Sequence, residues 1–159
     1  MVGVVSLVRG AVAGATAAAV WAASEPLVGR AFGTPYSDVR LLGRMLPVGA
    51  AWRPAGIALH LANGALFGAA FERLGGRGWV QGVVAAELEN AALWPGMAVL
   101  DRLHPDRRSG VWPPLAWNGR IFAYEATVHA IFGFVLGVLL PGPRRARDRQ
   151  LDRLAAAAT

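Results

Sequence analysis

The feature that most constrains the fold is the apolar stretch from Trp79 to Leu100, which carries Glu87, Glu89 and Asn90 near its middle. An apolar run of about 20 residues is long enough to cross the hydrocarbon core of a bilayer as a helix. A charged side chain at that depth costs about 3 kcal/mol, so it faces a partner or a wet cavity. The stretch therefore predicts a membrane helix whose polar side chains meet other polar groups inside a bundle.

Three further apolar runs predict an all-α fold, a bundle of four transmembrane helices. Apolar residues make up 55% of the chain and charged residues 16%, a balance that is unusual in soluble domains. The predicted spans cover about 10–28, 54–71, 79–100 and 121–140. Residues 1–143 then form one integral membrane domain, and the basic segment 144–159 is predicted to be a mobile tail. The alternative for the first run is a signal peptide, with Arg9 as its positively charged region and a cleavage site at Val20-Trp21-Ala22.

A short amphipathic helix is predicted after the first span. Ser37 is a suitable N-cap, and Asp38 favours the positive end of the helix dipole. One face of this helix would carry Val39, Leu42, Met45 and Leu46. This pattern indicates a helix that lies in the membrane interface, with a loop helix packed on the end of the bundle as the alternative.

The remaining connections predict how the spans are joined. The five-residue segment Leu74–Gly78 is so short that the second and third spans are expected to be antiparallel neighbours. Pro95 is expected to break the third span because it removes a backbone hydrogen bond, and we place the kink near Ala91. The loop 101–120 is expected to lie at the membrane surface with His104 in solvent.

Each span also carries a Gly-xxx-Gly pair. The pairs are Gly10/Gly14, Gly64/Gly68, Gly78/Gly82 and Gly133/Gly137. Small residues at this spacing let helix backbones approach closely in lipid. They predict a tightly packed bundle, and some of these faces are candidates for contact with a second copy of the chain or a partner membrane subunit.

The basic residues favour lipid as the main partner and exclude nucleic acid. All sixteen are Arg, and they cluster at the edges of apolar runs and in the segment after Pro143, where topology signals and headgroup contacts are expected. Eight fall on each side of the predicted bundle. The dense cluster after Pro143 favours a multi-pass protein of the cell membrane with both termini in the cytoplasm.

The polar side chains within the spans form the candidate site. They are His60, Asn63, Glu87, Glu89, Asn90, Glu125 and His129. At about 1.5 Å per residue they occupy the midplane and the half nearest the loop 101–120, which predicts one cavity open on that side and a second half almost free of polar groups. Helix geometry points Glu87 and Glu89 in different directions, so we expect Glu87 and Asn90, but not Glu89, to face the second span.

Three functions fit this cluster. The groups could satisfy one another within a structural or accessory membrane subunit, line a proton or small-solute path of a transporter, or bind a metal in a membrane enzyme through His60, His129 and Glu125. The chain has no Cys, which excludes thiolate sites and disulfides. It carries none of the common hydrolase, phosphate-loop or dinucleotide motifs. The sequence therefore favours an accessory subunit and leaves open whether the protein is an enzyme and whether it uses a cofactor.

Overall fold

The computed structural model describes residues 2–142, and this part of the chain is helical with no strand. The elements are α1 (Val2–Phe32), α2 (Asp38–Arg44), η1 (Gly49–Ala51), α3 (Trp52–Arg73), α4 (Gly78–Leu93), η2 (Trp94–Gly96), α5 (Met97–Leu103), α6 (Pro105–Arg108) and α7 (Gly119–Leu139). The prediction of an all-α fold is confirmed. The predicted mobile tail 144–159 lies outside the described residues.

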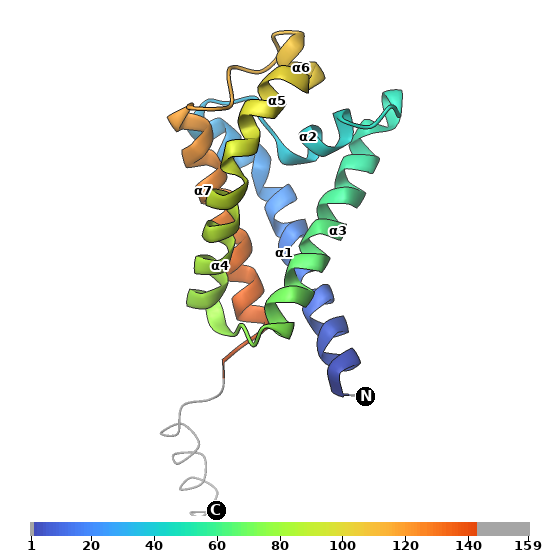
Figure 1. Cartoon of the computed structure of the whole chain (residues 1–159), viewed down its shortest axis with the longest axis vertical. Coiled ribbons are helices and arrows are strands. Elements are labelled where there is room, and N and C mark those ends of the chain that lie inside the picture. The colour runs from blue at the N-terminus through green and yellow to red at the C-terminus, as the bar shows by residue number, and fades with distance from the viewer. Residues whose placement is uncertain (1, 143–159) are drawn as a thin grey trace, which may run out of the picture.

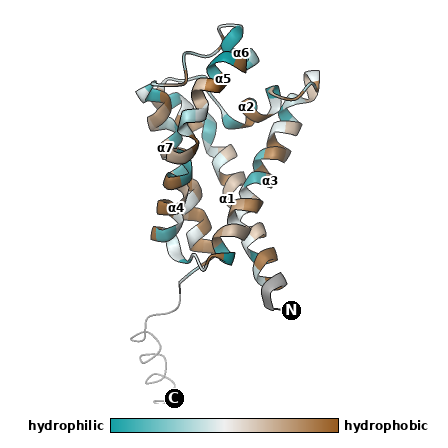
Figure 2. Cartoon of the chain, viewed as in Figure 1, coloured by the Kyte–Doolittle hydropathy of each residue, from teal (hydrophilic) through white to brown (hydrophobic). Residues whose placement is uncertain are grey.

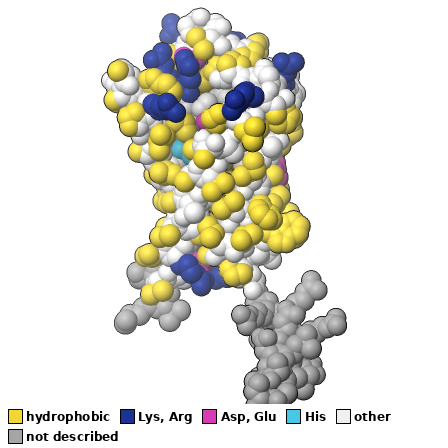
Figure 3. Space-filling model, turned by 180° about the vertical axis from the view of Figure 1, so that it is seen from behind, with side chains coloured by type: hydrophobic (Ala, Val, Ile, Leu, Met, Phe, Trp, Pro, Cys, Tyr) yellow, Lys and Arg dark blue, Asp and Glu magenta, His cyan; other side chains and the backbone are white. Residues whose placement is uncertain are grey.

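Three of the helices are long and apolar enough to cross a membrane. These stretches are Val5–Phe32, Gly49–Arg73 and Gly119–Leu139. Large apolar side chains such as Val12 and Leu66 are more than half exposed on the outer faces of the bundle. Hydrophobic residues recur along the long helices (Figure 2), and Figure 3 shows apolar side chains on the surface along the length of one face. In a membrane such side chains would contact lipid. The prediction is thus confirmed for a helical protein with three candidate spans, and a four-span bundle is not established.

The third predicted span is interrupted at Pro95. The α-helix ends at Leu93, a single 3₁₀ turn follows, and α5 continues the path to Leu103. The break expected at this proline is therefore present, two residues beyond the predicted position at Ala91. It leaves α4 with 16 residues, about 24 Å at 1.5 Å per residue, which is shorter than the hydrocarbon core.

The helices pack as two tight pairs, α1 with α3 and α4 with α7, which are joined where α1 meets α7. Although the short connection makes α3 and α4 antiparallel, the two helices diverge from it and are not packed along their length (Figure 1). The prediction that the second and third spans are packed neighbours is wrong. A short connection sets the direction of a helix, whereas packing follows the small-residue faces, and those of α3 and α4 point to different partners.

Both tight pairs are built on glycine. Gly10 and Gly14 of α1 meet Gly64 and Gly68 of α3, while Gly78 and Gly82 of α4 meet Gly133 and Gly137 of α7. A Cβ on most of these glycines would overlap the backbone of the facing helix. The predicted tight packing is confirmed inside one chain. Association with a second copy or a partner subunit stays a prediction.

An ion cluster around the buried carboxylate of Glu72 holds the end of the bundle where α1 begins. Glu72 is 3% exposed and accepts hydrogen bonds from the guanidinium groups of Arg9 and Arg77. At the same end the backbone N–H of Gly78 donates to the carbonyl of Leu140 at 2.8 Å. Glu72 lies one residue beyond the predicted span 54–71, at the edge of the half of the bundle that we expected to be almost free of polar side chains. Arg9 does not interrupt the first helix, because its charge is balanced here.

The opposite end, which carries α2, α5 and α6 (Figure 1), is called the loop end. Ser37 caps α2, as predicted, and accepts a hydrogen bond from the backbone N–H of Arg40 at 3.2 Å. Glu25 of α1 accepts three more, from the Ser37 hydroxyl and from the backbone N–H groups of Asp38 and Val39. The predicted amphipathic helix exists, and it packs on α3 in the manner of the alternative, a helix docked on the end of the bundle.

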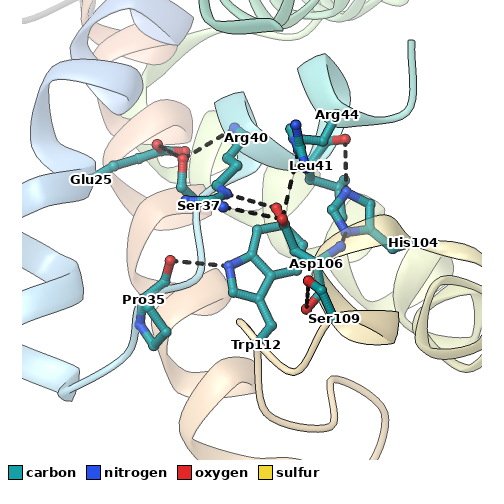
Figure 4. A network of polar contacts seen from close by, with 10 residues as sticks. All are labelled: Glu25, Pro35, Ser37, Arg40, Leu41, Arg44, His104, Asp106, Ser109 and Trp112. Atoms are coloured by element: carbon teal, nitrogen blue, oxygen red, sulfur yellow. Dashed lines mark hydrogen bonds and ion pairs between the residues drawn. The ribbon is translucent and has the colours of Figure 1, made fainter. Parts of the chain in front are cut away.

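The loop after α5 is tied to α2 by Asp106, which is 1% exposed. Its carboxylate accepts from the Arg40 guanidinium at 2.6 and 3.1 Å, and Arg44 lies 3.6 Å away (Figure 4). The same loop is fastened to itself by Asp101, whose carboxylate accepts from Arg107 at 2.7 Å and from two backbone N–H groups. This loop is therefore an ordered cap on the bundle.

His104 lies in the interior of this cap, so the expectation of a solvated histidine was wrong. Its ring stacks on Trp112 with 4.4 Å between centroids. One ring nitrogen accepts from the backbone N–H of Asp106, and the other lies 3.2 Å from the carbonyl oxygen of Leu41 (Figure 4). Burial lowers the pKa of His104, which favours the neutral ring that this donor and acceptor pair requires.

Candidate functional site

A cavity of about 540 Å³ lies inside the loop-end half of the bundle. Its walls come from α1, α3, α4 and α7, and α2 and α5 cover it at the loop end. Six of the seven predicted site residues line it, namely His60, Asn63, Glu89, Asn90, Glu125 and His129. The predicted polar cluster is therefore gathered around one space, with Glu87 outside it.

The roles of the two glutamates on α4 are the reverse of the expectation. Glu89 lines the cavity and places a carboxylate oxygen 3.6 Å from Nε2 of His129, whereas Glu87 does not line it. The buried face of α4 is set by Gly82 and Ala86, which pack on α7. Because α4 packs on α7 and not on α3, it is rotated away from the orientation that we predicted.

His129 links the two carboxyl groups nearest to it. Its Nδ1 lies 2.8 Å from the backbone carbonyl oxygen of Glu125 and 3.5 Å from that residue's carboxylate. A carbonyl oxygen can only accept, so Nδ1 carries a proton and Nε2 faces Glu89. The i, i+4 spacing that suggested this pair in the sequence brings Glu125 and His129 together as expected.

The hypothesis of a metal site gains no support from the arrangement. The indole of Trp21 packs edge-on against both imidazoles, 4.9 Å from His60 and 4.4 Å from His129 between ring centroids. Within residues 2–142 no group of three or more His, Asp or Glu side chains is placed to hold a metal ion. His60, His129 and Glu125 border the same space, but an aromatic ring lies between the two histidines.

Sequence reasoning missed three residues of the site, Trp21, Tyr36 and Asp38. The Tyr36 hydroxyl donates to Asp38 at 3.0 Å, and both side chains reach the cavity from the loop end. Burial and the neighbouring Glu25 raise the pKa of Asp38 to about 7. Asp38 was predicted only as a favourable residue at the start of a helix, and its spacing gave no signal that α2 would cover the cavity.

Five of the lining side chains carry buried polar atoms without a hydrogen-bond partner in the described chain. These atoms are Trp21 Nε1, Asp38 Oδ2, His60 Nε2, Asn90 Nδ2 and Glu125 Oε1. Glu125 is 1% exposed. Leaving such a group unpaired costs about 1–3 kcal/mol, so native proteins rarely contain several together. Their concentration around one cavity indicates a place where polar groups of a bound molecule or water are received.

The charge and the walls of the cavity restrict what it can receive. Three carboxyl groups, those of Asp38, Glu89 and Glu125, line it, and no Arg does. The rest of the lining is largely aromatic and aliphatic, including Trp21, Tyr36, Phe67, Trp94, Met97 and Phe132. Acidic groups within aromatic walls favour a ligand that is apolar over most of its surface and positively charged.

Comparison of the chain with protein-family models, with curated protein sequences and with solved structures finds no match.

Proposed function

We propose that the chain is a multi-pass protein of the cell membrane that binds a lipophilic organic cation in its intramembrane cavity. The observation that carries this proposal is a space lined by three carboxyl groups and by no Arg, in which the carboxyl oxygens Asp38 Oδ2 and Glu125 Oε1 have no hydrogen-bond partner in the described chain. In the proposal, α4, η2 and α5 together make a fourth crossing, and both termini lie in the cytoplasm. The three apolar helices support the membrane location.

Electrostatics favours a cation over an anion or a neutral ligand. Water in a half-buried cavity screens charge less than bulk solvent does, so one opposite charge at about 5 Å contributes about 3 kcal/mol at an effective dielectric constant of 20. Asp38, Glu89 and Glu125 approach the space from different elements, and His129 with its protonated Nδ1 faces Glu125. A ligand ammonium or similar cation would pair with these carboxyl groups and with the oxygen of Asn90.

The walls provide the apolar part of the recognition. Trp21 and Phe132 meet edge-to-face with 6.0 Å between their centroids, and Phe67 packs on Phe132 at 5.3 Å. A cation near the face of such a ring gains about 0.5–2 kcal/mol. The aromatic lining therefore accepts the apolar body of the ligand and adds to the attraction for its charge.

Entry from the lipid is consistent with the helix arrangement. The cavity lies where α3 and α4 diverge, and its lining includes the exposed side chains Asn63 and Leu93. A molecule that partitions into the bilayer would reach the carboxyl groups between these two helices without crossing the loop end. This route suits a lipophilic ligand.

A ligand accounts for the buried carboxyl oxygens that the helices leave without a well-oriented hydrogen bond, Asp38 Oδ2 and Glu125 Oε1. In a purely structural subunit these groups would satisfy one another between helices, and the hydrogen bond from Tyr36 to Asp38 shows that part of the cluster does so. Transport of the cation in exchange for a proton is the second candidate. It is favoured by Asp38, whose pKa of about 7 allows it to gain or lose a proton near neutral pH.

The test uses tetraphenylphosphonium as a cationic probe and tetraphenylborate as an anion of matched size and shape. We expect the full chain in detergent to bind the cation and not the anion in equilibrium dialysis. Glu89→Gln should weaken cation binding at least about ten-fold, the equivalent of 1.4 kcal/mol, because it removes a lining carboxylate. Glu87→Gln is the matched control and should leave the affinity unchanged, because Glu87 lies on the same helix but outside the lining. Equal affinity for both probes, or equal losses in the two variants, would overturn the proposal.

Binding should also depend on pH through Asp38. Because its pKa is raised to about 7, this carboxyl is mostly ionised at pH 8 and mostly protonated at pH 6, and only the ionised form attracts a cation. Probe affinity should therefore fall several-fold from pH 8 to pH 6, and Asp38→Asn should remove most of that change. Glu25, Tyr36 and Glu125 are the titratable groups that surround Asp38. An affinity that rises on acidification would contradict the assignment.

A further inference from the structure

A second hollow, of about 690 Å³, lies at the loop end on the other side of α2. It is bounded by the last turns of α1, the segment 33–37, α2 and the first turns of α3. These are the ends of two candidate spans, Val5–Phe32 and Gly49–Arg73. The hollow therefore lies at the level where a membrane helix leaves the hydrocarbon core for the headgroup region.

The hollow carries an excess of positive charge. Arg30, Arg40 and Arg53 line it. Arg40 is paired with Asp106, but Arg30 and Arg53 are exposed and make no ion pair with any described residue of 2–142. Figure 3 shows Arg side chains at this end of the molecule above an apolar body.

Glu25 is the acidic residue of this lining, and both of its carboxylate oxygens already accept hydrogen bonds. One of its carboxylate oxygens accepts from the Ser37 hydroxyl, and the other accepts from two backbone N–H groups of α2. It therefore does not compete for the guanidinium groups. Thr34 adds a hydroxyl whose oxygen accepts from the Tyr36 N–H at 3.2 Å, so its own proton is available to an anion.

Toward the middle of the spans the wall of the hollow becomes apolar, with Ala22, Pro26 and Ile57. Trp52 lies on the α3 side under the Arg40 guanidinium, 5.6 Å from it. An anionic lipid fits both parts of this hollow. Its charged headgroup would contact the basic rim, and the first carbons of its acyl chain would contact the apolar wall at the end of the two spans.

We propose that this hollow binds the headgroup of an anionic phospholipid, with its phosphate between Arg30 and Arg53 and an acyl chain along Ala22, Pro26 and Ile57. The phosphate receives charge-assisted hydrogen bonds from both guanidinium groups. The site is separate from the cation cavity and does not depend on it, because α2 and the buried Tyr36 stand between the two spaces.

The test measures lipid binding to the full detergent-solubilised chain by native mass spectrometry. Phosphatidylglycerol should bind more tightly than phosphatidylcholine with the same acyl chains. Arg30→Gln with Arg53→Gln should reduce that preference about ten- to thirty-fold, since each Arg near an anionic group contributes about five-fold. The double variant Arg102→Gln, Arg108→Gln is the matched control, because both residues are exposed, lie at the same end and make no ion pair with a described residue.

The outcomes distinguish specific lipid binding in this hollow from nonspecific electrostatic attraction and from binding of a soluble phosphate compound. The preference should survive in Arg102→Gln, Arg108→Gln and be retained in large part by Arg30→Lys with Arg53→Lys, which keeps the charge. Equal losses in the two glutamine variants, or no loss in either, would overturn the proposal. Glycerol 3-phosphate carries the same phosphate chemistry without the acyl chains. Competition by this soluble probe at the same affinity as the lipid would also overturn it.

Discussion

Alanine in place of Gly14 is expected to separate α1 from α3 and to lower the free energy of unfolding by about 3 kcal/mol, the upper range for overpacking. A Cβ at this position would overlap the backbone carbonyl of Gly64 and the Cα of Gly68. Backbone atoms cannot turn aside as a flexible side chain can, so the two helices must move apart. In lipid, close packing is a main source of helix association, and its loss is not offset by a hydrophobic gain.

The matched control is the same substitution at Gly96. This glycine lies in the 3₁₀ turn after α4 with a φ of −62°, and a Cβ there would meet nothing within 4 Å. Gly96→Ala should therefore leave stability unchanged or raise it slightly, because alanine restricts the unfolded chain more than glycine does. Unfolding in mixed detergent micelles, followed by circular dichroism, compares the two variants. Equal stability of Gly14→Ala and Gly96→Ala would contradict the glycine-based packing.

Alanine in place of Arg40 is expected to lower stability by about 3 kcal/mol, because it leaves a buried carboxylate without its main partner. Asp106 is 1% exposed, and Arg40 supplies both of its short guanidinium contacts. The guanidinium holds the pKa of Asp106 below its usual value. The ionised Asp106 carboxylate therefore stabilises the fold fully at pH values above about 4, the pKa of an aspartate in the unfolded chain. This stabilisation is lost as the pH falls through the lower pKa that Asp106 has in the folded protein.

Two companion variants distinguish a buried ion pair from a general loss of charge. Arg102→Ala removes an exposed guanidinium from the same cap and should change stability by less than about 0.5 kcal/mol. The double variant Arg40→Leu, Asp106→Leu removes both charges and should be more stable than Arg40→Ala alone, since no unpaired carboxylate remains. Unfolding near neutral pH measures all three. A double variant that is less stable than Arg40→Ala would contradict this explanation.

The helices and most of the site could be predicted from the sequence because their signals are local. Apolar runs located α1, α3 and α7, Ser37 identified the start of α2, and the i, i+4 spacing paired Glu125 with His129. The predicted depth of each polar residue along its helix indicated one shared cavity, and six of the seven predicted residues line it. These inferences need only helix geometry and the thickness of a bilayer.

The errors all concern which surfaces meet. Nothing local distinguishes a glycine pair that faces one helix from a pair that faces another, so α3 and α4 were expected to pack together. Because the predicted partner of α4 was wrong, the predicted rotation of α4 about its axis was wrong too. Glu87 was therefore expected at the site where Glu89 lies. The buried cap around His104 was missed for the same reason, because its partners Leu41 and Trp112 are distant in sequence.

The central claim is that a cavity lined by polar side chains opens between α3 and α4 within the helical bundle, and cysteine labelling tests it most directly. The chain has no Cys, so single Asn63→Cys and Ala62→Cys variants can be compared in nanodiscs with a water-soluble cationic methanethiosulfonate. Both positions are exposed and differ by one residue in depth, but only Asn63 lines the cavity. The cysteine at position 63 should react at least about ten-fold faster, because the reactive thiolate forms in a wet site and not against lipid. Equal rates at the two positions would contradict the cavity.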